Sequence, residues 1–201
     1  MPAPPPIILA SGSQARIAML SAAGLRFTAE AAAIDERALE APLLAAGTEP
    51  ADIATALAEA KATDVSSRHR TAVVIGSDQV LELDGKRWVK PASREEARAQ
   101  LRRLGGRAHH LHAAVAIARD GKVTWRHRDT AAMTMRPLDD AALTGYLDSV
   151  GDKVTGSVGA YQLEGPGVRL FEKIGGDYFT ILGMPLLPLL AELRRVEAIP
   201  W

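Results

Sequence analysis

The fold is decided by the stretch IILASGSQAR, residues 7–16, where an apolar run gives way to small polar residues. Ile7 to Ala10 are apolar, which predicts a short buried strand. Ser11 to Ser13 interrupt this run, and Ser13 is a suitable N-cap for a helix from Gln14 to about Ala23. A strand, a tight loop and a helix start therefore follow one another directly.

Strands and helices continue to intermix along the rest of the chain. The strands that the pattern predicts cover residues 27–34, 71–77, 81–88, 110–118, 122–135 and 168–174, with hairpin turns at 84–85 and 120–121. The predicted helices cover residues 51–67, 93–104, 138–150 and 184–196, the last with Pro185 in its first turn. We therefore predict an α/β fold with a mixed central sheet flanked by helices, as a single domain over residues 1–201.

Composition excludes several classes of function. The chain has 201 residues, 47% of them hydrophobic, and no cysteine, so disulfides, thiolate zinc sites and a cysteine nucleophile are ruled out. Lysine plus arginine equals aspartate plus glutamate at 24 each, which argues against stable binding to nucleic acid. The start, residues 1–6, is unlike a signal peptide, and no apolar run approaches the ~20 residues of a membrane helix. We therefore expect a cytoplasmic protein without membrane association.

Two cations occupy unusual positions. Arg16 falls in the first turn of its predicted helix, where the macrodipole disfavours positive charge unless an anion such as phosphate binds there. The alternative is an ordinary surface arginine. Lys61 lies on the apolar stripe of the helix over residues 51–67; here the alternative is a stem that reaches past its neighbours to water.

Two carboxylates and a third cation follow predicted strands. Asp78 comes directly after residues 71–77, and Glu36 follows residues 27–34 in the same way. Ligand sites of α/β proteins gather at such strand ends, and carboxylate oxygens suit magnesium or manganese. A helix cap or turn is the alternative for Asp78, and a surface turn is the alternative for Lys90, whose direction Pro91 would fix.

Other signals are weak. His109, His110 and His112 resemble a metal cluster, but strand alternation places His109 on the opposite face from the other two, and no carboxylate partner is evident. We interpret them as structural or exposed. The sequence contains neither a phosphate-binding P-loop nor a glycine-rich dinucleotide fingerprint.

A set of ordered motifs resembles the Maf-like nucleotide pyrophosphatases over almost the whole chain. The motifs are residues 9–16 (LASGSQAR), 34–36 (IDE), 58–62 (AEAKA), 76–80 (GSDQV), 90–91 (KP), 104–109 (LGGRAH), 156–165 and 175–186. The resemblance implies a Maf-like, ITPase-like fold with a deep cleft, often as a homodimer. It also implies metal-dependent hydrolysis of a nucleoside triphosphate to the monophosphate and pyrophosphate, with Mg²⁺ or Mn²⁺.

The same resemblance implies a role for each unusual residue. Ser13, Arg16, Lys61 and Lys90 become phosphate ligands, with Lys90 part of the catalytic set. Glu36 and Asp78 become groups that bind the metal or activate water, with Asp78 as the proton acceptor.

Three positions bear on the base. The branch associated with thymidine and uridine triphosphates has Arg, Thr and Gln where this chain has Ala15, Gln79 and Glu164. Gln79 with Glu164 resembles instead the branch associated with 7-methyl-GTP. Glutamate accepts hydrogen bonds, and guanine offers donors at N1 and its 2-amino group, which favours a guanine-type base. Ala15 stands where that branch often carries an aromatic residue, so a wider pocket with broad specificity is the alternative.

The sequence is compatible with two other functions. One is a broad or pyrimidine-preferring house-cleaning pyrophosphatase acting on dTTP or UTP. The other is a regulatory protein linked to cell division that binds nucleotides or nucleic acid. Neutral charge and few aromatic residues speak against a strand-binding surface.

Overall fold

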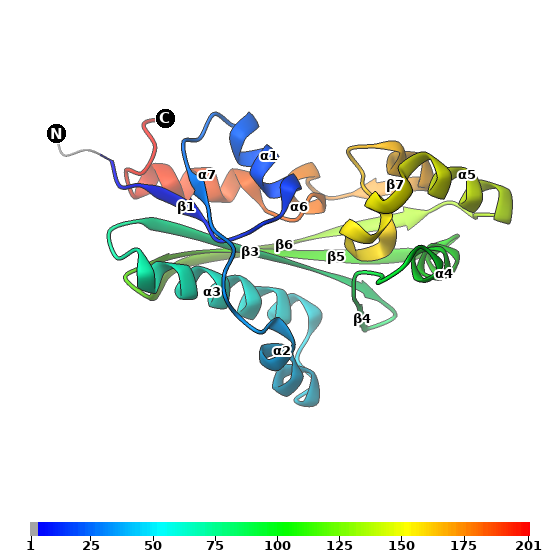
Figure 1. The fold of residues 1–201 in the computed structure, drawn as a ribbon, viewed down its shortest axis with the longest axis horizontal. Helices are drawn as coiled ribbons and strands as arrows, with labels where there is room; N and C mark the ends of the chain where they lie inside the picture. The colour runs from blue at the N-terminus through cyan, green and yellow to red at the C-terminus, as the bar shows by residue number, and fades with distance from the viewer. Residues whose placement is uncertain (1–3) are drawn as a thin grey trace.

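A seven-stranded sheet forms the centre of the computed structural model, which describes residues 4–201 (Figure 1). The strands are β1 (Ile7–Leu9), β2 (Thr28–Ala29), β3 (Val73–Leu83), β4 (Lys86–Trp88), β5 (Ala108–Arg119), β6 (Lys122–Met135) and β7 (Phe171–Gly175). Their order is β2-β1-β3-β5-β6-β7, and β4 also pairs with β3. β1 pairs in parallel with β2 and β3, whereas the other pairs are antiparallel. The predicted mixed α/β sheet is therefore confirmed.

Helices cover both faces of this sheet. They are α1 (Gln14–Ala22), α2 (Glu36–Ala45), α3 (Pro50–Arg68), α4 (Arg94–Leu104), α5 (Asp140–Val150), α6 (Tyr178–Ile181) and α7 (Leu186–Arg195). α2 and α3 lie on one side, α1, α6 and α7 on the other, and α4 and α5 at the far end of the long strands (Figure 1). Three short 3₁₀ helices connect α5 to β7. In residues 4–201 no helix has the length and apolar character that a bilayer crossing requires.

The two predicted hairpins form because their turns accept left-handed backbone conformations. Asp84 and Gly85 have φ values of 55° and 72°, and Asp120 and Gly121 have values of 48° and 72°. Positive φ at both central residues matches the right-handed twist of the flanking strands, and Asp-Gly is well suited to it. The second hairpin joins β5 to β6, the two long strands that extend along most of the length of the molecule (Figure 1).

Gly76 allows α3 to lie directly on the backbone of β3. A Cβ atom at this glycine would stand 2.1 Å from the carbonyl oxygen of Ala58 and 2.6 Å from the nitrogen of Ala62. Neither contact is possible for a larger residue, because both atoms belong to the helix backbone. The close approach places Lys61, the residue before Ala62, against the middle of β3.

Five details of the prediction were wrong. The strand predicted over residues 27–34 is only Thr28–Ala29, because its neighbour β1 is three residues long. Residues 166–170 form a 3₁₀ helix before β7, since Gly167 packs closely against the backbone of Gln162. Pro185 is the N-cap of α7 and precedes its first turn. β3 continues past residue 77, so Asp78 lies inside the strand, and Glu36 begins α2 after its N-cap Asp35.

The three histidines divide between the faces of β5 as alternation predicted. His109 is 1% exposed, and its Nε2 lies 2.8 Å from the hydroxyl of Tyr161. His110 and His112 face Glu82, whose Oε2 lies 3.6 Å and 3.2 Å from them, so the expectation of no carboxylate partner was wrong. The sheet register brings Glu82 opposite, which the sequence alone does not reveal. Within residues 4–201 no three such side chains are arranged to hold a metal.

Burial of His109 should make the free energy of unfolding depend on pH. Burial, with a smaller contribution from His110, lowers the pKa of His109 to about 4 from 6.5. Between these values the unfolded chain binds a proton that the folded chain does not, so stability falls as the pH drops. The shift corresponds to ~3 kcal/mol, fully lost near pH 4. His109→Gln should flatten this decline, as measured by urea unfolding between about pH 7 and about pH 5. A decline as steep as in the parent would contradict the assignment.

Candidate active site

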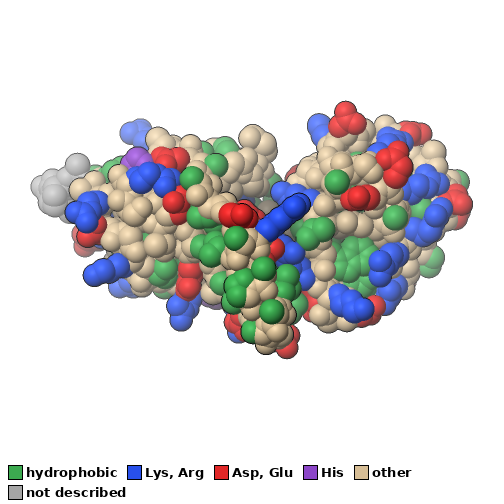
Figure 2. Space-filling view, turned by 60° about the horizontal axis from the view of Figure 1, so that its bottom comes forward, with side chains coloured by type: hydrophobic (Ala, Val, Ile, Leu, Met, Phe, Trp, Pro, Cys, Tyr) green, Lys and Arg blue, Asp and Glu red, His purple; other side chains and the backbone are tan. Residues whose placement is uncertain are grey.

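The site lies at a gap along one edge of β3. On this edge β1 pairs with Val73–Ile75 and β4 pairs with Leu81–Leu83, while β5 occupies the other edge. In the described part of the chain, no strand pairs with the first edge over residues 76–80. A cleft of about 1800 Å³ opens there. Figure 2 shows the surface hollowed between the two ends of the molecule, with charged side chains at the mouth beside α2. The deep cleft that the resemblance implied is thus present.

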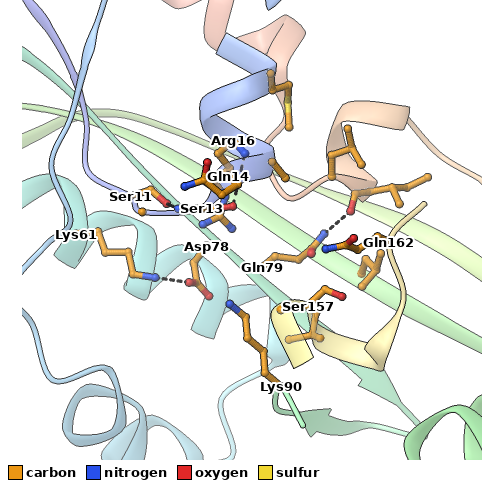
Figure 3. A pocket seen from close by; sticks show the side chains of 18 of the residues that line it. Ser11, Ser13, Gln14, Arg16, Lys61, Asp78, Gln79, Lys90, Ser157 and Gln162 are labelled. Carbon is orange, nitrogen blue, oxygen red and sulfur yellow. Dashed lines mark hydrogen bonds and ion pairs between the residues drawn. The ribbon is translucent and has the colours of Figure 1, made fainter. Parts of the chain in front are cut away.

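The nine residues that the sequence singled out all line this cleft: Ser13, Ala15, Arg16, Glu36, Lys61, Asp78, Gln79, Lys90 and Glu164. They come from α1, α2, α3, β3 and three connecting segments. Direct ion pairs join three of them, and the other six share the cleft. Lys90 extends toward Asp78 from the side opposite Lys61 (Figure 3).

Lys61 forms the charged centre of the cleft with two carboxylates. Its Nζ lies 2.6 Å from Oδ1 of Asp78 and 2.8 Å from Oε1 of Glu36. Lys61 is 9% exposed and Asp78 is 8% exposed, so the ammonium does not reach past its neighbours to bulk water. An ammonium has three donors, and two of them are used here, which leaves one for a ligand.

The N-terminus of α1 brings Ser13 and Arg16 to the same cleft. The Ser13 hydroxyl caps the helix at 3.5 Å from the backbone nitrogen of Arg16. Nε of Arg16 donates to the carbonyl of Gly183 at 2.9 Å, which fixes the direction of the guanidinium. Burial lowers the pKa of Arg16, while Asp78 and Glu36 act in the opposite direction. Arginine stays cationic under these conditions, so a helix N-terminus and a guanidinium together offer an anion site.

Strand alternation turns Gln79 away from Asp78, toward the C-terminal end of α6. Its Nε2 donates to the carbonyls of Thr180 and Ile181 at 3.0 Å and 2.9 Å. Both amide donors are therefore used, and Oε1 is left as an acceptor. These two contacts with the backbone restrict Gln79 to accepting hydrogen bonds from a ligand.

Sequence reasoning missed several polar residues of the cleft, among them Glu40, Arg87, Ser157 and Gln162. Glu40 and Arg87 form an ion pair with each other. Gln162 points into the cleft close to Gln79, and Ser157 lies below it (Figure 3). Polar residues inside the glycine-rich stretch 156–165 were a usable signal for Gln162, whereas nothing in the sequence pairs Glu40 with Arg87.

The carboxylates at the centre fit a hard divalent cation. Magnesium is commonly held by one or two carboxylates together with the phosphates of the substrate. Glu36 and Asp78 supply two such groups within reach of one ammonium, next to the anion site of α1. The donor set therefore suits a cation that arrives with, or is completed by, a polyphosphate.

The chain belongs to the Maf-like protein family, whose model matches residues 6–196. It is 58% identical to the 7-methyl-GTP pyrophosphatase of Mesorhizobium japonicum, covering 96% of this chain and 97% of that protein. It is 56% identical to the 7-methyl-GTP pyrophosphatase of Rhizobium meliloti, covering 97% and 98%. It is also 53% identical to the nucleoside triphosphate pyrophosphatase of Bradyrhizobium diazoefficiens, covering 96% and 95%.

Proposed function

We propose that this chain hydrolyses nucleoside triphosphates to the monophosphate and pyrophosphate, with preference for a guanine-type base such as 7-methylguanine. The observation that carries the proposal is that one cleft brings the Lys61–Asp78–Glu36 cluster together with the N-terminus of α1 and the acceptors Gln79 and Glu164. The names of the relatives, which describe the same class of reaction, support it.

The phosphate chain binds among Ser13, Arg16, Lys61 and Lys90, which offset its negative charge. Lys61 already engages Oδ1 of Asp78, so Oδ2 is the oxygen that accepts a proton from the attacking water. The water oxygen forms a bond to the α-phosphorus as the bond to the bridging oxygen breaks, and pyrophosphate leaves. Glu36 and Asp78 would hold a divalent cation, which when bound would further neutralise the charge on the phosphates.

The base end of the cleft presents acceptors. Oε1 of Gln79 and the carboxylate of Glu164 both accept hydrogen bonds, and guanine offers donors at N1 and its 2-amino group. Methylation at N7 gives the ring a positive charge, which a carboxylate favours. Aromatic side chains of Trp88, Tyr161 and Tyr178 also line the cleft, and aromatic faces attract cationic rings.

Glu164→Gln should lower kcat/KM for GTP and 7-methyl-GTP by about tenfold, because an acceptor-only group is replaced by one whose amide donors oppose those of guanine. UTP turnover should change by less than about twofold. The comparison requires kcat/KM for all three nucleotides in both proteins. Glu172→Gln, on the exposed strand β7 outside the cleft, is the matched control. An unchanged substrate profile in Glu164→Gln would remove Glu164 from base recognition.

The test of the function itself is pyrophosphate release from GTP, 7-methyl-GTP, UTP and dTTP, with magnesium or manganese. A preference for a guanine nucleotide supports the whole proposal. A preference for UTP or dTTP keeps the reaction and rejects the base assignment. No release from any nucleotide by a folded, metal-supplied sample rejects the reaction, and DNA binding by that sample would favour a regulatory role.

A further inference from the structure

Helix α2, which carries Glu36, packs against the rest of the molecule through a charged residue and not through an apolar stripe. Of its ten residues, the only buried one is a charged residue, Glu40, which is 5% exposed. Leu39 and Leu44 of the same helix are exposed, and Leu43 is only partly buried against the apolar cluster of α3. A surface helix normally buries an apolar stripe. Here a carboxylate occupies the place of that stripe.

The partner of Glu40 is Arg87 on strand β4. Oε1 of Glu40 accepts from Nη2 of Arg87, and both residues line the nucleotide cleft. Burial raises the pKa of Glu40, although the Arg87 guanidinium opposes this effect. β4 also contacts α4, because the guanidinium of Arg103 on α4 lies over the ring of Trp88 on β4, 4.9 Å from the ring centre. The ion pair therefore joins α2 to a hairpin that is fixed to the far end of the molecule.

The two ends of this connection are close to the reacting groups. Glu36 and Glu40 are four residues apart on one helix, so they lie on the same face in successive turns. Arg87 precedes Lys90 by three residues along the strand and the segment that leaves it. A displacement of either partner would thus shift Glu36 or Lys90 relative to Asp78. Buried ion pairs add little to stability, but they can specify one arrangement.

We infer that the Glu40–Arg87 ion pair is a positioning element, which holds α2 and the β3–β4 hairpin at the separation that catalysis requires. The inference rests on the proposed pyrophosphatase reaction for its kinetic consequence. In this inference neither side chain contacts the substrate. Glu40 acts through Glu36 on the same helix, and Arg87 acts through Lys90, which follows it along the chain.

The kinetic test compares Glu40→Gln, Arg87→Gln and the double variant. Each single change should lower kcat by about tenfold or more with a smaller change in KM, since misplacement by about 1 Å can reduce rates strongly. The double variant should be no slower than the slower single variant, because both changes break the same connection. Glu59→Gln is the matched control: Glu59 pairs with Arg126 on the surface, outside the cleft, and its loss should leave kcat unchanged. Multiplying defects in the double variant would overturn the inference, as would unchanged kcat in both single variants.

A distance measurement makes the test independent of activity. The chain has no cysteine, so spin labels can be placed at Ala38→Cys on α2 and Lys86→Cys on β4, both at exposed positions. The distance distribution between the labels should be narrow, and it should broaden or lengthen when Glu40→Gln is added. If the labelled parent releases no pyrophosphate, the proposed function fails while this comparison still holds. An unchanged distribution in the Glu40→Gln protein would overturn the inference whatever the kinetics show.

Discussion

Asp78→Asn should reduce pyrophosphate release by about a thousandfold, because a positioned general base contributes on the order of 10²–10⁴ to the rate. Asparagine has the size of aspartate, and its side-chain oxygen can still accept from Lys61, whose Nζ lies 2.6 Å from Oδ1 in the parent. It has no carboxylate to take the proton of water. The fold should therefore persist while turnover is lost.

The measurement is kcat with the preferred triphosphate, together with the midpoint of thermal unfolding for each protein. Asp148→Asn is the matched control, since Asp148 is exposed on α5, pairs with Arg94 and lies outside the cleft. A folded Asp78→Asn protein with more than about a tenth of parental kcat would show that another group accepts the proton.

Lys61→Met should damage both activity and stability. The change leaves Asp78 buried beside Glu36 without the ammonium that lies between them. Removing one member of a buried ion pair typically costs ~3–5 kcal/mol, and Glu36 is half exposed, so we expect the lower end of that range. The loss of a phosphate ligand at the same site should lower kcat/KM by at least about a hundredfold.

Urea unfolding and steady-state kinetics measure the two effects. Adding Asp78→Asn to Lys61→Met should restore part of the lost stability, because it removes the uncompensated charge, but no activity. Lys122→Met, at the exposed start of β6, controls for removal of a lysine. Additive losses of stability in the double variant would mean that Lys61 and Asp78 do not stabilise one another.

Most of the fold follows from local signals. The hairpins at residues 84–85 and 120–121 and the strand–loop–helix of residues 7–16 depend on turn and cap chemistry within a few residues, and all appear as predicted. The errors in the lengths of β2 and β3 arise because the neighbouring strand determines how far each of them extends. β2 consists only of the two residues that pair with β1, and β3 runs on past residue 77 because it pairs with β5 as far as Glu82.

The candidate site was predictable as a set of residues but not as an arrangement. Lys61 was conspicuous as a cation on an apolar stripe, and the structure explains it through Asp78 and Glu36. The ion pair of Glu40 with Arg87 joins residues 47 positions apart. Each of the two is an ordinary polar residue of its own element, so only the three-dimensional arrangement reveals the pair.

Because α3 rests on the backbone of β3 at Gly76, we expect the two elements to open together, among the slowest motions of the folded domain. Loop movements on the nanosecond to microsecond scale should therefore leave the backbones that carry Lys61 and Asp78 at the same separation. In the proposed reaction, the reorganisation energy is reduced accordingly, since the charges that would meet the triphosphate are in place before it arrives. On this proposal the substrate moves into position in each turnover, toward an ammonium and a carboxylate whose supporting backbones are already in place.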